Sequence, residues 1–226
     1  MKDGYRHEYK YLISTASAEL LKRRLPAIMA RDPHAGPSGQ YTIRSLYFDD
    51  RNYSAYDEKL SGISDRLKYR IRYYNYDTRM IRLEKKEKHG GLTRKTGKSI
   101  TLADALHLQS GSSEVCPDTQ GELITELRCG ISCGLRPAIL VDYDRTPFVC
   151  NAGQTRITID ENIRTRPYCA SLLASENAMI PVLEDGIVVL EVKFNDFLPG
   201  YLAEALADVP KINFAISKYV LCLNTI

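Results

Sequence analysis

Charged side chains recur at every second residue in several stretches of the sequence. A Glu-x-Lys pattern occurs three times, at Glu8/Lys10, Glu84/Lys86 and Glu191/Lys193. In a β-strand, a spacing of two places both side chains on one face. Carboxylate oxygens are ligands for Mg²⁺ or Mn²⁺, and ammonium groups bind phosphate. The spacing therefore favours a site for a phosphate compound with its metal.

The basic residues between positions 66 and 72 follow the same alternation. Arg66, Lys68, Arg70 and Arg72 alternate with the apolar residues Leu67, Tyr69, Ile71 and Tyr73. A solvated face of an antiparallel sheet would give this pattern as well. Glu191 argues for burial, because its stretch Ile187–Asn195 is apolar enough for a central strand. There a carboxylate is costly unless it is paired or bound to a ligand.

Inward-pointing polar faces would collect many cations with few carboxylates. The basic set is Lys10, Arg70, Arg72, Lys86, Arg145, Arg156 and Lys218, and the acidic set is Glu8, Glu84 and Glu191. Confined like charges repel strongly, and a polyanion relieves that repulsion. Arginine offers phosphate two parallel hydrogen bonds, and lysine offers a compact charge. We expect a triphosphate or polyphosphate in this interior, with metal held by the glutamates.

The elements that must position these residues follow from the alternation and from turn residues. The predicted strands are Tyr5–Ser14, Tyr41–Phe48, Asp65–Tyr74, Met80–Lys88, Leu92–Thr101, Ala138–Val149, Thr155–Asp160 and Ile187–Asn195. The predicted helices are Ala16–Ala30, Asp50–Leu60, Leu102–Gln109, Glu122–Cys129, Leu198–Leu206 and Ala215–Leu223, with polar loops at Arg31–Gln40 and Ser110–Gly121. This order predicts an α+β fold: a closed antiparallel β-barrel of about eight strands with helices packed outside, forming a single domain over residues 1–226.

Composition narrows the class of protein. The 226 residues are 44% hydrophobic and 26% charged, with a net charge of only +3, so we expect no nucleic-acid partner. No run of about 18 apolar residues occurs and the start of the chain is charged, so neither a membrane-inserted helix nor a signal peptide is expected. The six cysteines form no CxxC pair. Free thiols in the cytoplasm are the simplest interpretation.

Six of these motifs, in order along nearly the whole chain, resemble the VTC domain. They are Arg6–Tyr11, Ser45–Asp49, Lys68–Tyr74, Arg82–Lys86, Leu190–Lys193 and Ser217–Tyr219. The VTC domain is the polyphosphate polymerase module of the triphosphate tunnel metalloenzyme, or CYTH-like, superfamily. The resemblance implies a closed tunnel barrel, Mn²⁺ or Mg²⁺ as cofactor, ATP as phosphate donor and a growing inorganic polyphosphate chain as acceptor.

The resemblance also implies roles for individual residues. Phosphate-binding positions match Lys10, Arg70, Arg72, Lys86, Arg145, Arg156 and Lys218, a substrate-contacting tyrosine matches Tyr143, and the metal-binding glutamate matches Glu191. Glu8 and Glu84 are expected as further metal carboxylates from the charge pattern alone. One more family lysine matches either Lys98 or Lys95. Lys193 and Lys68 are expected as additional phosphate contacts.

Two other functions remain open from the sequence. A tunnel-type triphosphatase or cyclase would act on an organic triphosphate, and a non-catalytic module would only bind polyphosphate. Tunnel hydrolases similar to this chain usually begin with Glu-x-Glu-x-Lys. Here Arg6 occupies the place of the first of those carboxylates, which favours the polymerase.

Overall fold

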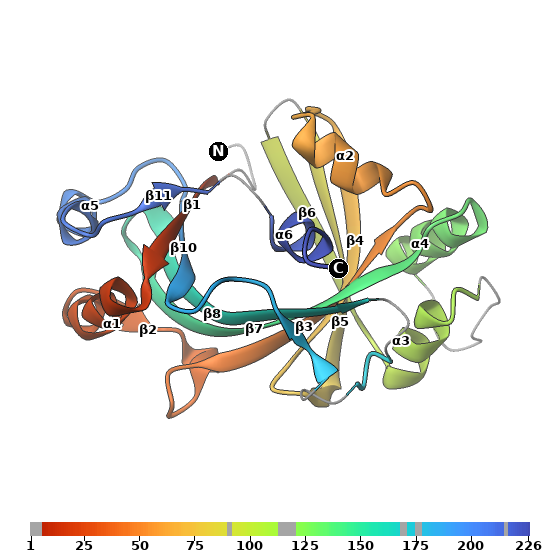
Figure 1. Ribbon diagram of the computed structural model, residues 1–226, viewed down its shortest axis with the longest axis horizontal. Helices are drawn as coiled ribbons and strands as arrows, with labels where there is room; N and C mark the ends of the chain where they lie inside the picture. The colour runs from red at the N-terminus through yellow and green to blue at the C-terminus, as the bar shows by residue number, and fades with distance from the viewer. Residues whose placement is uncertain (1–5, 90–91, 113–120, 168–170, 175–177, 215–216) are drawn as a thin grey trace. The chain divides into compact units, whose positions relative to one another are not determined.

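A computed structural model describes residues 6–89, 92–112, 121–167, 171–174, 178–214 and 217–226 (Figure 1). Every strand pair whose register is defined is antiparallel, and the predicted α+β class is confirmed. The strands are β1 (His7–Ser14), β2 (Ala30–Arg31), β3 (Tyr41–Asp49), β4 (Arg66–Tyr74), β5 (Asp77–His89), β6 (Leu92–Ile100), β7 (Arg136–Cys150), β8 (Thr155–Pro167), β9 (Ile180–Pro181), β10 (Ile187–Phe194) and β11 (Ile212–Asn213).

Hydrogen bonding places the strands in the order β11-β1-β10-β8-β7-β3-β4-β5-β6, with β2 paired to β7 and β9 to β8. This path has two ends, and among the described residues no ladder joins β6 to β11. The predicted closed barrel is therefore not confirmed. Within the described ranges the sheet has eleven strands instead of about eight, because β2, β9 and β11 have two residues each and are too short to show an alternation.

The helices are α1 (Thr15–Arg24), α2 (Ser54–Leu60), α3 (Leu102–Gln109), α4 (Glu122–Ser132), α5 (Gly200–Ala207) and α6 (Lys218–Leu223). The Ser14 hydroxyl caps α1 by accepting a hydrogen bond from the Ser17 backbone N–H at 3.1 Å. The predicted extension of this helix to Ala30 is wrong. The chain changes to a short 3₁₀ turn at Leu25, because Pro26 lacks the N–H that an α-helix interior requires.

The ends of several other strands and helices differ from the predicted ends, because the alternation of polar and apolar residues is weak there. β8 continues to Pro167, seven residues beyond the predicted end, and β7 begins at Arg136. The described part of the last helix begins at Lys218, and residues 215–216 lie outside the described residues, as do Tyr5 and residues 113–120 of the predicted polar loop. No helix in the described part has both the length and the apolar character needed to cross a bilayer.

The chain folds into two compact units whose segments alternate along the sequence. Unit 1 comprises the described residues of Met1–Thr42, Tyr143–Ile163 and Pro181–Ala215. Unit 2 comprises those of Ile43–Asp142, Arg164–Ile180 and Ile216–Ile226. The prediction of a single domain stays a prediction.

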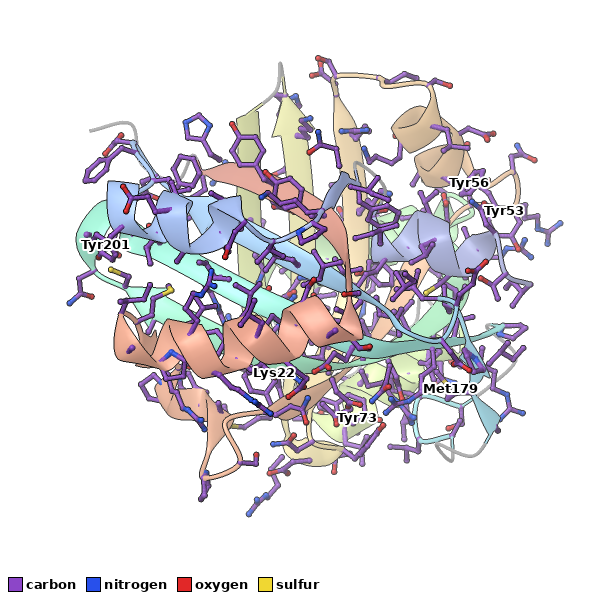
Figure 2. All side chains as sticks on the ribbon, turned by 60° about the vertical axis from the view of Figure 1, so that its left-hand side comes forward. Lys22, Tyr53, Tyr56, Tyr73, Met179 and Tyr201 are labelled. Carbon is purple, nitrogen blue, oxygen red and sulfur yellow. The ribbon has the colours of Figure 1, made fainter. Side chains whose placement is uncertain are left out.

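Unit 1 has one apolar and one charged strand face. The apolar side chains of β1, β8 and β10 pack against α1 and α5 in one buried cluster that includes Ile159, Leu190, Leu21 and Leu202. An ion pair also joins α1 to the sheet, since the Lys22 ammonium, labelled in Figure 2, lies 2.7 Å from a Glu161 carboxylate oxygen of β8. The helices thereby cover one face, and the charged residues are left on the other.

Unit 2 repeats this division. Apolar side chains of β4 and β5, such as Ile71 and Leu83, pack against α3 and α4 through Ala105 and Leu127. The opposite face carries the basic residues of β4, and α6 contacts that face. A two-residue turn at Asn75 and Tyr76, both with positive φ, joins β4 to β5. Positive φ at both positions is the geometry that matches strand twist in a tight hairpin, so the turn sets the register of the charged face.

A buried ion pair stabilises unit 2 where β3 meets β7. The Arg44 guanidinium donates hydrogen bonds to both carboxylate oxygens of Asp142, at 2.8 and 2.7 Å, and both residues are at most 1% exposed. A second arm of the same group donates to the carbonyl oxygens of Leu172 and Ala174. Sequence analysis did not predict this pair, because neither residue is distinctive by type or spacing.

We predict that Arg44→Met lowers the free energy of unfolding by about 3–5 kcal/mol, because it leaves the Asp142 carboxylate buried without a counter-charge. Urea unfolding followed by circular dichroism measures the change. The control is Arg79→Met, which removes an arginine that is 87% exposed and paired with Asp77. That surface pair is expected to contribute less than about 1 kcal/mol. Equal losses in the two variants would contradict the prediction.

Candidate functional site

The charged face of unit 1 contains two of the three Glu-x-Lys pairs. The β1–β10 register places Glu8 opposite Lys193 and Lys10 opposite Glu191, so opposite charges meet across the ladder. The Lys10 ammonium is 2.7 Å from Glu8, and the Lys193 ammonium is 2.6 Å from Glu191. Glu191 is buried at 4% exposure. The alternation therefore predicted correctly that these four side chains share one face.

Arg145 of β7 connects this face to a second carboxylate. Its guanidinium donates two hydrogen bonds to Asp160, at 2.6 and 2.7 Å, and one to Glu191 at 3.3 Å. Burial acts against the charge, but Asp160 and Glu191 hold the pKa of Arg145 above its ordinary value. The Tyr143 ring lies 5.2 Å from the Arg145 guanidinium carbon. Arg145 is thus a buried, permanently charged group on this face.

Arg156 of β8 belongs to the same face, because it pairs with Lys193 in the β8–β10 ladder. It donates hydrogen bonds to Asp32 at 2.8 Å and to the Tyr41 hydroxyl at 2.9 Å. Its Nε atom is buried without a hydrogen-bond partner, and so is the hydroxyl of Thr158, opposite Glu191. Buried polar groups are normally hydrogen-bonded, so these two atoms indicate a place where a polar ligand or water binds.

Glu84 is the centre of the charged face of unit 2. It is 2% exposed, its carboxylate accepts a hydrogen bond from Arg70 at 2.6 Å, and it forms ion pairs with Arg72 and Lys95. Burial alone would raise its pKa, but the cations Arg70, Arg72 and Lys95 lower the pKa to about 2. Glu84 is therefore ionised at neutral pH and holds three cations together.

The choice between Lys95 and Lys98 is a question of register. The β5–β6 ladder places Lys95 opposite Lys86, on the charged face, whereas Lys98 lies opposite Leu83, on the apolar side. Burial, with repulsion from Arg70 and Arg72, lowers the pKa of Lys95 to about 8, although Glu84 acts in the opposite direction. Of the two lysines, the structure brings Lys95 to the cationic cluster.

Lys68, on the same face of β4, has a buried ammonium without a hydrogen-bond partner. This nitrogen lies 4.5 Å from the centre of the Tyr219 ring of α6, whose hydroxyl donates a hydrogen bond to Asp49. Burial lowers the pKa of Lys68 to about 8, and the repulsion of nearby cations adds to this, while Asp49 opposes it. Lys68 is thus a desolvated amine on the charged face of unit 2.

Tyr47 of β3 links the cations of this face to α6. Arg70 donates a hydrogen bond to its hydroxyl at 3.1 Å, and the Tyr219 ring lies 5.3 Å from its own. Burial would raise the pKa of Tyr47, but the positive charges of Arg70, Arg72 and Lys218 lower it overall. Lys218, at the start of α6, therefore acts electrostatically on the same face as Arg70.

The two carboxylates of unit 1 that are predicted to hold a divalent cation, Glu8 and Glu191, share a face on neighbouring strands. Mg²⁺ is usually held by one or two protein carboxylates with phosphate oxygens completing its shell, so this pair fits the expected metal. In the part of the chain that the structure describes, no three His, Cys, Asp or Glu side chains form a group that could hold an ion by themselves. The metal-binding role predicted for Glu84 stays a prediction.

Several residues that were not predicted from the sequence contact the predicted phosphate-binding residues. Asp160, Asp32 and the two aromatic residues Tyr47 and Tyr219 all touch predicted phosphate-binding residues. Asp160 could have been found, because it continues the alternation of Arg156 and Thr158 along β8. Asp32 carried no such signal, since it lies in a loop far from Arg156 in the sequence.

Comparison with solved structures shows which proteins resemble this chain in fold. A "putative adenylate cyclase" from Bacillus halodurans matches with a TM-score of 0.51 and 17% identity, over 91% of this chain and 89% of that chain. The PH1819 protein of Pyrococcus horikoshii matches with a TM-score of 0.47 and 12% identity, over 97% and 99%. The first likeness shows a shared fold.

The sequence itself gives the family. The family model of the VTC domain matches residues 5–226, so the chain belongs to the VTC domain family, and the resemblance seen in its motifs is confirmed. The sequence has no match among curated proteins.

We predict that Glu84→Gln lowers the free energy of unfolding by about 3 kcal/mol at pH 7, because Arg70, Arg72 and Lys95 lose their shared counter-charge. The pKa of Glu84 is depressed, so its contribution is present above the ordinary value of 4.5 and is lost as pH falls toward 2. The difference between wild type and variant should therefore shrink over that range.

Urea unfolding at a series of pH values measures this difference. The control is Glu126→Gln, because Glu126 pairs with Lys85 while 35% of its side chain is exposed. A pair of this kind contributes at most about 1 kcal/mol. A loss in Glu84→Gln no larger than in the control would show that the carboxylate does not hold the cluster together.

Proposed function

We propose that the chain is a metal-dependent polyphosphate polymerase, which transfers the γ-phosphate of ATP to the end of a growing polyphosphate chain. The observation that carries the proposal is that the charged face of each unit has buried polar atoms without a hydrogen-bond partner. They are Lys68 Nζ in unit 2, and Arg156 Nε and Thr158 Oγ1 in unit 1. A phosphate oxygen can accept hydrogen bonds from all three kinds of group, and membership of the VTC family supports this ligand.

The charge balance on the charged face of unit 2 also supports a phosphate ligand. In unit 2, one buried carboxylate, Glu84, is shared by Arg70, Arg72 and Lys95. Lys68 and Lys86 extend this basic surface along the same strands. Because the cations outnumber their carboxylate, a bound polyanion would lower the repulsion among them. Arg70 and Arg72 can bind phosphate oxygens bidentately, and the lysines supply compact charge.

In the proposed reaction, an oxygen of the terminal acceptor phosphate bonds to the γ-phosphorus of ATP. The bond between that phosphorus and the β–γ bridging oxygen breaks, and ADP leaves. Phosphoryl transfer needs little covalent help from the protein, so the cations act by positioning both phosphate groups and spreading their charge. Glu191 and Glu8 would hold Mg²⁺ or Mn²⁺, which neutralises charge on the phosphate oxygens. The attacking phosphate is already ionised, so a strong general base is not required.

A second candidate is hydrolysis or cyclisation of an organic triphosphate. The fold is shared with a protein described as a cyclase, and the same cations could hold its substrate. Water as the acceptor would make the chain a triphosphatase. A module that only binds polyphosphate is the third candidate.

We predict that the purified chain with ATP and Mn²⁺ forms a polyphosphate ladder, seen on a stained polyacrylamide gel. Arg70→Ala and Glu191→Gln should each reduce it by on the order of 100-fold, the usual loss when a charge-stabilising group is removed. Arg79→Ala removes an exposed arginine that pairs with Asp77 and should leave the ladder unchanged.

Other reaction products would contradict the proposal and indicate a different function. Release of phosphate without a ladder would indicate a triphosphatase, and release of pyrophosphate with a cyclic nucleotide would indicate a cyclase. Saturable binding of polyphosphate without any product would indicate a binding module. Circular dichroism of each variant separates loss of activity from loss of fold.

We further predict that affinity for tripolyphosphate falls as pH rises from 7.5 to 9. Lys68 and Lys95 have pKa values of about 8, well below the ordinary lysine value of 10.5, so both lose their charge in this range. Isothermal titration calorimetry measures the dissociation constant at each pH. Lys95→Arg keeps the charge at high pH and should flatten the profile. A profile that is equally steep in that variant would exclude Lys95 as a phosphate contact.

A further inference from the structure

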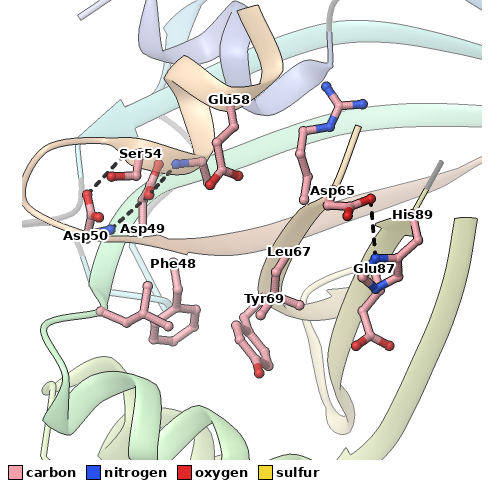
Figure 3. Close-up of a pocket in the computed structure, with 13 residues that line it drawn as sticks. Phe48, Asp49, Asp50, Ser54, Glu58, Asp65, Leu67, Tyr69, Glu87 and His89 are labelled. Carbon is pink, nitrogen blue, oxygen red and sulfur yellow. Dashed lines mark hydrogen bonds and ion pairs between the residues drawn. The ribbon is translucent and has the colours of Figure 1, made fainter. Parts of the chain in front are cut away.

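A pocket of about 420 Å³ opens on unit 2, near α2 and the neighbouring ends of β4 and β5 (Figure 3). It lies on the side of the sheet opposite Lys68 and Arg70. Three β4 residues line it: Leu67 and Tyr69 on the apolar face, and Arg66 at the end of the strand. Lys68 and Arg70 alternate with Leu67 and Tyr69 and point to the other face. Phosphate chemistry on the cationic face therefore does not account for this pocket.

The pocket is acidic. Five carboxylates line it, against the single arginine Arg66 and the histidine His89. Two of the five serve the fold, because Asp49 and Asp50 accept hydrogen bonds from backbone N–H groups at the start of α2. The remaining three carboxylates are Glu58, Asp65 and Glu87. The pocket thus combines a negative charge with the volume typical of a ligand site.

These three carboxylates surround the pocket from different elements, as Figure 3 shows. Glu58 extends from α2, and its side chain makes no hydrogen bond or ion pair within the described residues. Asp65, just before β4, lies 3.4 Å from the imidazole of His89, and Glu87 lies 2.9 Å from the ammonium of Lys85. A cation entering here would meet carboxylate oxygens from more than one direction.

Apart from Ser54, the rest of the lining is apolar, with Phe48, Ala55, Leu67, Tyr69 and Leu135. Leu67 is 41% exposed. The segment between Glu58 and Leu67 also exposes Leu60 and Ile63, at 53% and 48%. Exposed apolar side chains beside a charged pocket extend the surface beyond what one small cation could cover. They match a ligand in which positive and apolar groups alternate.

We propose that this pocket docks a basic, amphipathic segment of a partner protein. An arginine or lysine of the segment would place its charged end between Glu58 and Asp65 and its alkyl chain along Leu67. Neighbouring apolar residues of the segment would cover Leu60 and Ile63. Charge complementarity selects this occupant, because the five carboxylates repel the polyanions that suit the opposite face of the sheet.

The test uses the full chain and a fluorescein-labelled peptide, Arg-Leu-Arg-Arg-Leu-Arg, with fluorescence anisotropy as the readout. The peptide should bind saturably, and its Glu-Leu-Glu-Glu-Leu-Glu counterpart should not. The double variant Glu58→Gln/Asp65→Asn should raise the dissociation constant at least about tenfold, because it removes the charges while keeping side-chain size. The matched control is Glu204→Gln, an exposed glutamate of α5 outside the pocket, which should change the constant by less than about twofold.

Leu67→Ser gives a second readout, because it removes the apolar contact without changing the charge and should also weaken binding. Unchanged peptide affinity in Glu58→Gln/Asp65→Asn would overturn the proposal, as would a loss of the same size in Glu204→Gln. Competition by spermidine as effective as by unlabelled peptide at equal charge would show that the pocket takes a small cation and not a protein segment.

Discussion

Crowding of like charges on strand faces is the constraint on which the rest of each unit depends. Alternate residues of one strand share a face, so Lys68, Arg70 and Arg72 cannot separate without breaking β4. The repulsion is offset by one deeply buried carboxylate, Glu84. In unit 1 the signs are reversed, because the two carboxylates of Asp160 and Glu191 share the single guanidinium of Arg145. In both units, like charges are thus stabilised by a shared, buried counter-charge: Glu84 in unit 2 and Arg145 in unit 1.

The opposite strand faces make this arrangement stable. Their apolar residues pack against α3 and α4 in unit 2 and against α1 and α5 in unit 1. Packing against helices decides which face is covered, and a shift of one residue in register would move every cation into the apolar core. The tight turn at Asn75 and Tyr76 helps to prevent such a shift between β4 and β5.

Membership of a family and likeness in fold support different conclusions about this protein. The VTC model matches nearly the whole chain and establishes the family, whereas the likeness to the Bacillus halodurans protein, at 17% identity, establishes only the fold. The chemistry therefore rests on the side chains. Buried polar atoms without a hydrogen-bond partner, such as Lys68 Nζ, are the most direct indication of a ligand site, because a stable fold rarely leaves such groups without a ligand or water.

Local alternation was enough to divide charged from apolar faces, because the direction of a side chain follows from the backbone of its own strand. The α+β class followed from it, and so did the placing of Glu8 with Lys10, and of Glu191 with Lys193, on one face of their strands. The partners could not be predicted in this way. Only the β5–β6 register separated Lys95 from Lys98, and only the loop before β3 brought Asp32 to Arg156. The open strand path and the buried Arg44–Asp142 pair also required tertiary structure. Pairing between distant strands and the burial of a charge depend on residues far apart in the sequence, which no local pattern records.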